Sequence, residues 1–309
     1  MKYILALIPC LLTSCAIVFS QSNVDEALSN YYSQYLKGES TMVISNSLVK
    51  MNSDAVFNRL ERNTLDTSER KRYATFKLID FIGIKSADAS VRKRAVKQLV
   101  LGCKDKDGGI VGTVLKDLTF YNIADFEPES KYLLSEMSKK PMPHYELVIK
   151  ICGWLNITDL IYNFRQMITD KKGNVMQRWA MRLAMARMGE QDMLDYCMQR
   201  IRNIPVNDNM AYDLVPDMVY TRQRPMFDYL FKIIESDDKN CSSPNPDSNA
   251  KILCGYRVIE QIAPYIKYFP VEVGVSGDLK VKNYEKALID VRNWIKQNKD
   301  TYVIKNEEF

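Results

Sequence analysis

The sequence predicts an all-α protein in which helix pairs stack into an α-solenoid. Glycine and proline are scarce, with 12 and 11 copies among 309 residues, and this scarcity favours long regular elements over a turn-rich β fold. Apolar residues make up 46% of the chain, which is enough for a substantial core, and they recur at helical spacing. One helical pattern repeats at an interval of about 33 residues, as expected for helix pairs that bury their apolar faces by stacking.

Residues 1–20 are predicted to be an export signal that is removed from the mature chain. Lys2 supplies the positive charge at its start, the run Tyr3–Phe19 is apolar and uncharged, and small residues precede a cleavage site before Gln21. The alternative is lipidation of Cys15, because Leu12–Cys15 resembles a bacterial lipobox. The apolar run continues beyond Cys15, and this continuation favours simple cleavage.

Residues 21–85 are predicted to be N-terminal capping helices of the array. Such elements are needed because the terminal unit of an array would otherwise expose its core face. Further amphipathic segments lie around Val56–Leu60 and Tyr73–Ile82. The stripe of the first predicted helix consists of Val24, Leu28, Tyr31, Tyr32, Tyr35 and Leu36.

The repeated pattern lies in the middle of the chain. Three predicted helices carry apolar residues at i, i+3 or i+4, and i+7 or i+8, which is the stripe of an amphipathic helix. Asp159 and Asp192 are predicted N-caps of two of them, and Pro225 opens the third, where its missing N–H costs nothing. The stripes are Leu160, Phe164 and Ile168; Leu194, Cys197 and Ile201; and Phe227, Leu230 and Ile234.

The stretch Ser86–Val100, SADASVRKRAVKQLV, has an aspartate ahead of a Val-Arg pair, followed by small and apolar residues at helical spacing. In this pattern the chain resembles the HEAT-like repeat family, with Asp88 at the inter-helix turn and Arg92 in the Val-Arg pair. Arg178 fits a second copy of the pattern. The resemblance implies a right-handed α-α superhelix of the HEAT-like or ARM type over residues 86–268, and a structural role for these three residues.

The C-terminal part of the chain departs from the repeat. Pro216 lies inside a predicted helix, and residues 237–249 form an insertion. Residues 269–309 are predicted to be a C-terminal cap made of a short β-hairpin and an amphipathic helix over 284–295. The hairpin is predicted from alternating apolar residues on both sides of a turn, namely Val271, Val273, Val275, Leu279 and Val281.

Cysteine usage is consistent with export. Cys241 and Cys254 bracket a Pro/Ser/Asn-rich loop, and in an oxidising compartment they are predicted to form a disulfide. Cys103, Cys152 and Cys197 occur in apolar helical contexts and are predicted to be small buried residues. The sequence has no CxxC or Cys/His ligand spacing, so we expect no metal site.

Candidate catalytic groups are few. His144 is the single histidine, and we expect it to cap or pack rather than act as a base. Two carboxylate pairs, Glu127 with Glu129 and Asp213 with Asp217, are the alternative route to an enzyme. The glycine-rich stretch KDGGIVGT lacks the Lys-Ser/Thr ending of a phosphate loop, so no cofactor is predicted.

The charge pattern argues against nucleic acid as a partner. The net charge of +5 arises from 43 basic and 38 acidic residues that are interspersed along the chain. The basic triplets Arg70–Arg72 and Arg92–Arg94 lie in predicted helices, and we interpret them as solvated faces.

We therefore expect a non-catalytic binding or scaffolding protein of the bacterial envelope or periplasm, associated with a membrane only if Cys15 is lipidated. Its partner is expected to be a protein, or alternatively a glycan, held on the concave face of the solenoid. The alternatives are an enzyme with a carboxylate or aromatic site on that face and a structural subunit of an envelope complex. Trp179 is alternatively a packed core residue. The predicted binding row is Lys93, Lys97, Glu146, Lys150, Trp179, Arg182 and Tyr212.

Overall fold

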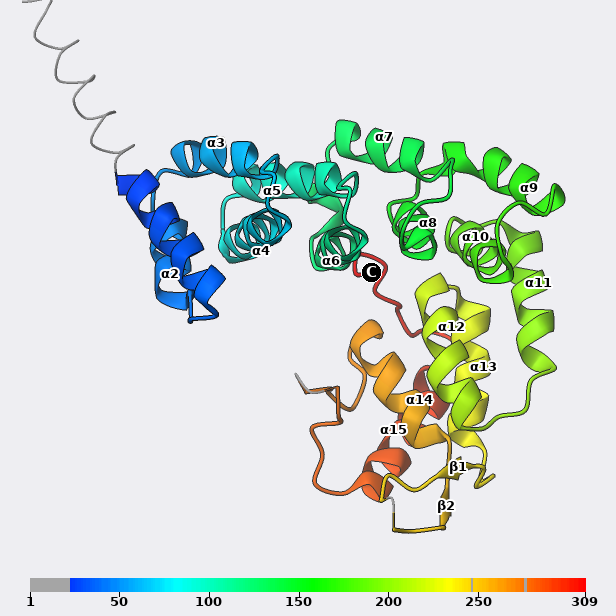
Figure 1. Cartoon of the computed structure of the whole chain (residues 1–309). Helices are drawn as coiled ribbons and strands as arrows, with labels where there is room; N and C mark the ends of the chain where they lie inside the picture. The colour runs from blue at the N-terminus through cyan, green and yellow to red at the C-terminus, as the bar shows by residue number, and fades with distance from the viewer. Residues whose placement is uncertain (1–22, 246, 275–276) are drawn as a thin grey trace, which may run out of the picture. The chain divides into compact units, whose positions relative to one another are not determined.

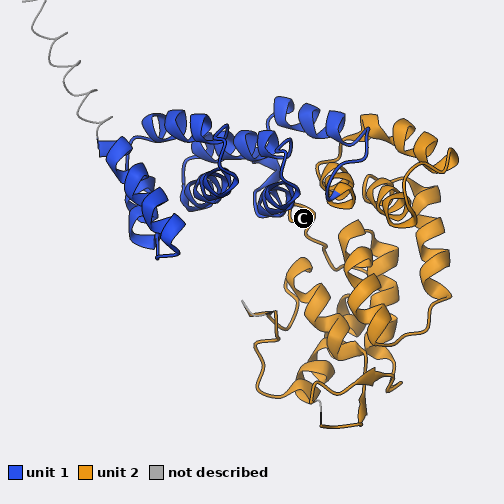
Figure 2. Cartoon of the chain, viewed as in Figure 1, with its two compact units in different colours: residues 1–144 blue, residues 145–309 orange. Residues whose placement is uncertain are grey.

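The computed structural model describes residues 23–245, 247–274 and 277–309, and over these residues the protein is mostly α-helical. The chain divides into two compact units, residues 1–144 and residues 145–309 (Figure 2). The predicted export signal and Cys15 lie outside the described residues. Within the described ranges, no helix is both long enough and apolar enough to cross a membrane.

Unit 1 is a succession of helices joined by short turns. In Figure 1, α3, α5 and α7 run across the view, whereas α4 and α6 are seen end on. Helix α5 packs against α4, α6 and α7 and is therefore central to this unit. A first helix covers residues 23–37, and the others are α2 (Met42–Val49), α3 (Ser53–Asn63), α4 (Glu69–Lys85), α5 (Ala89–Gly102), α6 (Gly108–Leu118), the 3-10 turn η1 (Ile123–Asp125) and α7 (Pro128–Met137).

Side-chain caps explain where the helices of unit 1 begin. Asp88 accepts a hydrogen bond from the backbone N–H of Ser90 at 2.8 Å, so its predicted place at the turn before α5 is confirmed. Asn52 and Asp107 cap α3 and α6 in the same way. Each cap satisfies a backbone N–H that has no partner within the helix, which stabilises the helix by about 1 kcal/mol.

The first helix docks on α4 through two tyrosines. The hydroxyl of Tyr31 donates to the carbonyl oxygen of Ala74, and the hydroxyls of Tyr32 and Thr75 share a hydrogen bond, both at 2.9 Å. The predicted stripe of this helix is thereby confirmed except at its end, where Leu36 is 41% exposed.

Arg72 corrects the interpretation of the first basic triplet as a solvated face. Its guanidinium is buried and donates to both carboxylate oxygens of Asp105, at 2.7 and 2.9 Å. It also donates to the carbonyl oxygens of Asp66 and Thr67 in the turn before α4. Asp105 lies in the turn between α5 and α6, so the packing of α4 on α5 brings it to Arg72.

The same helical position holds an arginine in α5 and in α10 (Val175–Arg187). Arg92 donates to Asp125 at 3.1 Å and to the carbonyl oxygen of Ala87 at 2.9 Å. Arg178 donates to the carbonyl oxygens of Lys171 and Gly173 in the loop before α10. Both guanidiniums hold the turn that precedes their own helix, which is a structural role.

Unit 2 begins with three helices that pack on α10. These are α8, α9 and α11, and α10 also contacts α12. Helix α14 packs against both α12 and α13 (Figure 1). The elements are α8 (Tyr145–Trp154), η2 (Thr158–Leu160), α9 (Ile161–Thr169), α10, α11 (Gln191–Arg202), the π-turn η3 (Met210–Leu214), α12 (Val215–Thr221), α13 (Arg224–Glu235), β1 (Cys241–Ser242), β2 (Lys251–Ile252), α14 (Gly255–Ile262), η4 (Ala263–Tyr265) and α15 (Tyr284–Asn298).

The predicted apolar stripes lie on α9, α11 and α13, except that Leu160 belongs to η2 and precedes α9. Phe164, Cys197 and Leu230 at their centres are fully buried. Two predicted caps are wrong. Asp159 lies within η2, and Asp192 lies in the first turn of α11, where it pairs with Arg165 at 2.6 Å. The helix boundaries differ by one or two residues from those that the apolar spacing predicts, and this difference moves both aspartates off the capping position.

Pro216 is accommodated by a local change in helix winding. Residues Met210–Leu214 form a π-turn that leads directly into α12, so Pro216 occupies the second position of α12. In a continuous α-helix a proline lacks the N–H for the ladder and clashes with the carbonyl four residues earlier. The π-turn widens the backbone at this point and relieves that conflict. Pro225 occupies the second position of α13, as the sequence predicts.

The predicted Cys241–Cys254 disulfide is present, with a Cα–Cα distance of 5.1 Å. Inside the loop that it closes, Cys241 pairs with Ile252 and Ser242 with Lys251 in a small antiparallel sheet. These two-residue strands were not predicted, because so short a pair leaves no alternating pattern in the sequence. Cys103, Cys152 and Cys197 are buried, as predicted.

The predicted C-terminal hairpin is reduced to one bridge between Val273 and Leu279. The N–H of Lys280 donates to the carbonyl oxygen of Glu272 at 2.8 Å, but the described residues 271–274 and 277–281 form no regular strand. Val275 and Ser276 lie outside the described residues. Helix α15 follows and buries Ala287, Leu288, Val291 and Ile295, as predicted.

Candidate partner-binding site

A groove of about 630 Å³ lies in unit 2 between α8, α10, α11, η3 and α12. It contains four of the seven residues of the predicted binding row, which come from helices that are distant in sequence. We name it the Trp179 groove. Its lining consists of Glu146, Lys150, Val175, Met176, Trp179, Ala180, Arg200, Ile204, Tyr212, Asp213, Leu214, Pro216 and Asp217.

Asp217 organises the inner part of the Trp179 groove. One of its carboxylate oxygens accepts a hydrogen bond from the indole Nε1 of Trp179 at 2.7 Å, and the other accepts one from Nζ of Lys150 at 2.5 Å. Trp179 as a whole is 9% exposed, so it is a packed residue that also lines the groove. A charge-assisted hydrogen bond to a buried carboxylate fixes the ring and the cation in one arrangement.

The rim of the Trp179 groove is apolar, aromatic and basic. Tyr212 on the π-turn is 53% exposed, and Val175 and Met176 in the first turn of α10 are 59% and 62% exposed. The guanidinium of Arg257 lies 5.5 Å from the centre of the Tyr212 ring, and that of Arg200 lies 5.5 Å from the centre of the Trp179 ring. Exposed apolar side chains beside aromatic rings and arginines are typical of protein-binding surfaces.

Arg182 does not belong to this groove. Its guanidinium stacks on the ring of Tyr196 with a separation of 4.5 Å, and it donates to the carbonyl of Arg178. Arg182 belongs to the predicted binding row, but it lies about one helical turn beyond Trp179 and contacts α11 instead of the groove. Val175 and Met176 were missed, because apolar residues at a helix start are usually interpreted as core.

Lys93 and Lys97 lie in unit 1, where they line a cavity of about 560 Å³ along α5. Lys97 pairs with Glu129 at 2.8 Å, and Lys93 lies 3.9 Å from Glu127. The acidic pair proposed as a catalytic alternative therefore faces the lysines of α5. Opposite charges at these distances attract, so the two lysines and the two glutamates hold α5 against the start of α7.

Asp213 and Asp217 both line the Trp179 groove, as the alternative enzyme hypothesis requires. Asp217 already accepts hydrogen bonds from Lys150 and Trp179. Both carboxylate oxygens of Asp217 are therefore engaged within the protein. His144 is exposed in unit 1 and its Nε2 lies 3.1 Å from the carbonyl oxygen of Gly108.

A group of titratable residues that the sequence did not single out lies between α4 and α6 of unit 1. Lys77 Nζ is 3.1 Å from both oxygens of Asp117 and 3.9 Å from Asp80. Burial, followed by the charge of Asp117, raises the pKa of Asp80 to about 6. Burial also raises the pKa of Asp117 above its ordinary value. The buried Asp117 and the half-buried Asp80 thus lie beside one lysine, and Asp80 is partly protonated near pH 6.

Comparisons with family models, with curated proteins and with solved structures find no match to this chain. Among the residues that the structure describes, no cluster of three histidine, cysteine or acidic side chains could hold a metal ion.

Proposed function

We propose that this chain is an exported, non-catalytic binding protein of the bacterial envelope that holds a protein partner in the Trp179 groove. The observation that carries the proposal is the combination of a fixed aromatic floor with an exposed apolar and basic rim. Trp179 is held by Asp217, whereas Tyr212 and Met176 present their side chains to solvent. A rigid floor lowers the entropy cost of binding, and the exposed rim supplies apolar area for burial.

We propose that the scaffold is a right-handed HEAT-like solenoid. Three features support this assignment: the Asp88 cap, the arginines that hold the turns before their helices, and the ion pairs of Arg72 with Asp105 and Arg92 with Asp125. Each ion pair joins residues 33 positions apart, which equals the interval of the apolar pattern. Such contacts tie one helix pair to the next in a stacked array.

Export is supported by the disulfide and by the composition of residues 1–20. The Cys241–Cys254 bond requires an oxidising compartment to persist. Cleavage before Gln21 would yield a protein without a lipid anchor, whereas lipidation of Cys15 would place it in the membrane fraction. Intact mass of the exported protein distinguishes the two, because a diacylglycerol group on Cys15 adds a defined mass.

The binding proposal is tested by substituting the exposed rim. Tyr212→Ala removes a ring that is 53% exposed, and Tyr162→Ala on α9, where the ring is 75% exposed, is a matched control outside the groove. We expect Tyr212→Ala to weaken the binding of a purified protein partner about tenfold or more. The melting temperature of the variant should equal that of the parent. We expect Tyr162→Ala to bind like the parent. Equal affinity of all three proteins would refute the site.

The alternative function is hydrolysis of a glycan, favoured by the three carboxylates that line the same groove. Glu146, Asp213 and Asp217 supply acidic side chains at a site with two aromatic rings. Asp213→Asn distinguishes the two functions. A binding protein keeps its affinity for the protein partner in this variant, whereas an enzyme loses turnover of envelope glycans measured by mass spectrometry.

A further inference from the structure

Two arginines of unit 2, the half-buried Arg187 and the buried Arg222, lie close together. Arg187 ends α10, and Arg222 follows α12 with a positive φ of 54° and 6% exposure. Burial lowers the pKa of Arg187 to about 10, and the neighbouring charge of Arg222 adds to the effect. Within the described part of the chain, neither guanidinium forms an ion pair with an aspartate or glutamate side chain.

Both arginines donate to carbonyl oxygens of α12, Arg187 to Tyr220 at 2.6 Å and Arg222 to Val219, and their remaining donors reach residues 305–309. Arg222 donates to the backbone oxygens of Lys305 at 3.1 Å and Phe309 at 2.8 Å. Arg187 donates to those of Glu308 at 2.8 Å and Asn306 at 3.3 Å. The indole Nε1 of Trp154 donates to that of Glu307 at 3.1 Å. All five successive backbone oxygens therefore accept a hydrogen bond from a side chain of α8, of α10 or of the residue after α12.

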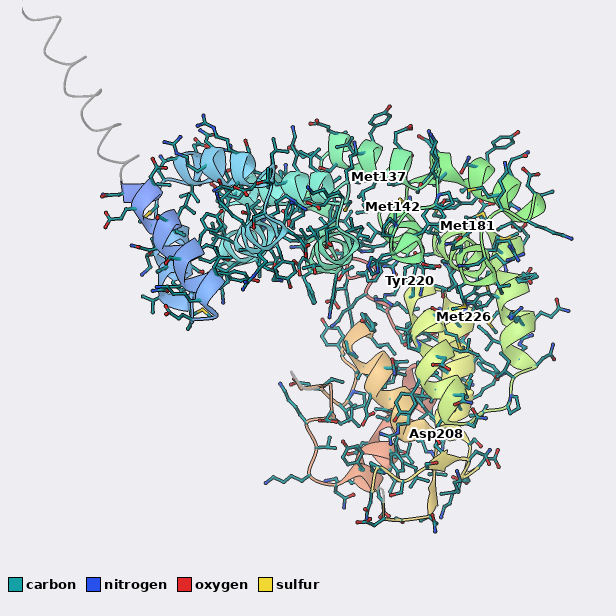
Figure 3. The ribbon with its side chains drawn as sticks, viewed as in Figure 1. Met137, Met142, Met181, Asp208, Tyr220 and Met226 are labelled. Atoms are coloured by element: carbon teal, nitrogen blue, oxygen red, sulfur yellow. A yellow bond between two sulfur atoms is a disulfide. The ribbon has the colours of Figure 1, made fainter. Side chains whose placement is uncertain are left out.

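The end of the segment is held by aromatic rings. The ring of Phe309 lies 5.6 Å from that of Trp154, nearly perpendicular to it, and 5.7 Å from that of Tyr220 (labelled in Figure 3). Arg187 lies over the Tyr220 ring at 4.9 Å, and Tyr220 donates its hydroxyl proton to the carbonyl oxygen of Lys150 at 2.6 Å. These contacts hold the rings in place from α8 and α10.

We propose that Trp154, Arg187, Tyr220 and Arg222 form a binding site for an extended acidic peptide that carries an aromatic residue, and that residues 305–309 are its tethered occupant. We name this surface the cradle. The occupant it fits is a segment of a partner protein with the pattern acidic, acidic, aromatic, as in Glu307, Glu308 and Phe309.

The chemistry of the cradle supports recognition of a peptide in general. Its hydrogen bonds reach backbone oxygens, which every extended peptide presents in the same spacing. The two guanidiniums are also fixed by aromatic rings, Arg187 over Tyr220 at 4.9 Å and Arg222 over Tyr265 at 3.7 Å, so their donors are held in place beside residues 305–309. The positive charge of the two guanidiniums favours an acidic peptide. Burial lowers the pKa of Arg222, whereas Tyr265 and, to a smaller extent, the charge of Glu308 raise it.

The chain is anchored immediately before the cradle, so the tether is short. The buried Tyr302 donates its hydroxyl proton to Asp228 at 2.8 Å, and its carbonyl oxygen accepts a hydrogen bond from Arg224 at 2.7 Å. Between Tyr302 and the cradle lie a bridge between Ile266 and Ile304 and backbone hydrogen bonds from Lys267 to Val303 and from Lys305 to Tyr265. Residues 305–309 compete for the cradle at an effective concentration on the order of millimolar. A partner peptide therefore binds measurably only when the contacts of residues 305–309 with the cradle are weakened.

The test uses the full chain and a fluorescein-labelled synthetic peptide with the sequence of residues 303–309, VIKNEEF. Phe309→Ala weakens the tethered segment, so we expect this variant to bind the peptide about tenfold or more tightly than the parent in fluorescence anisotropy. The matched control is Tyr268→Ala, whose ring is 93% exposed, and it should bind like the parent.

Two further arms show whether the peptide occupies the cradle. Adding Arg222→Lys to Phe309→Ala keeps the charge but removes the forked donors, and it should abolish the gain, with circular dichroism melts confirming that the variant is folded. A peptide whose phenylalanine is replaced by alanine should not bind. No gain from Phe309→Ala, or a gain that survives Arg222→Lys, overturns the proposal. The proposal is also overturned if the parent forms dimers and Phe309→Ala abolishes them. In that case the occupant of the cradle is residues 305–309 of a second copy of this chain. The Tyr212 test addresses a different surface, so either proposal can fail alone.

Discussion

Removing the guanidinium of Arg72 should destabilise unit 1 strongly. In the structure the side chains of Arg72 and Asp105 are 4% and 5% exposed, and two hydrogen bonds of 2.7 and 2.9 Å join them. Arg72→Ala leaves the Asp105 carboxylate buried without its cation, which costs about 3–5 kcal/mol of unfolding free energy. The carbonyls of Asp66 and Thr67 also lose their donors, adding roughly 1 kcal/mol.

The assay is urea unfolding of the full chain, followed by far-ultraviolet circular dichroism. The Arg72 pair lies within unit 1, so we expect the loss in the transition in which unit 1 unfolds. A double-mutant cycle with Asp105→Asn isolates the pair. Asparagine at position 105 removes the buried charge that Arg72→Ala leaves without a partner. The double variant should therefore be at least about 2 kcal/mol more stable than the sum of the losses of the two single variants predicts.

Acidification provides a second check on the Arg72 pair. Burial raises the pKa of Asp105, but the hydrogen bond from Arg72 and that from the N–H of Asp107 outweigh it, so the folded-state pKa lies below the ordinary value of 3.8. In the parent the contribution of the pair is present above pH 3.8 and is lost as the pH falls through the lower folded value. In Arg72→Ala the pKa of Asp105 rises. The difference in unfolding free energy between the parent and this variant should therefore shrink as the pH falls towards 4. This reasoning would be refuted if Arg72→Ala lowered the unfolding free energy by less than about 1 kcal/mol. Additive losses in the double-mutant cycle would refute it as well.

Two further predictions concern the disulfide and the buried acids. Replacing Cys241 and Cys254 by serine should lower the unfolding free energy by about 3 kcal/mol, and a non-reducing peptide map of exported protein should show the two peptides joined; two unmodified thiols would contradict the bond. Asp80→Asn should raise stability by about 1–2 kcal/mol at pH 8, because the ionised Asp80 is disfavoured by burial. This gain should disappear as the pH falls from 6 to 4, since the folded parent then binds a proton that its unfolded chain lacks; urea unfolding at a series of pH values that shows a constant gain would contradict the assignment.

The helices of this protein and several of their ends follow from local sequence. Apolar spacing marks the faces of α9, α11, α13 and α15, because a helix places residues three and four apart on one side regardless of what it packs against. Asp88 caps α5 through a bond that spans two residues. The Cys241–Cys254 bond closes a short loop whose composition marks it. These interactions are local, so the residues that make them stand within one window of the chain.

The candidate sites depend on contacts between residues that are far apart in the sequence. Trp179 meets Asp217 across 38 positions, and Trp154 meets Glu307 across 153. Arg72 resembles a solvated lysine or arginine in sequence, but the turn after α5 brings it a carboxylate. The predicted binding row assumed one regular array, whereas its lysines on α5 and its aromatic residues on α10 and η3 line separate cavities. Periodicity determines which face of a helix is buried, but only the packing of the helices determines which polar groups on the remaining faces come within hydrogen-bonding distance.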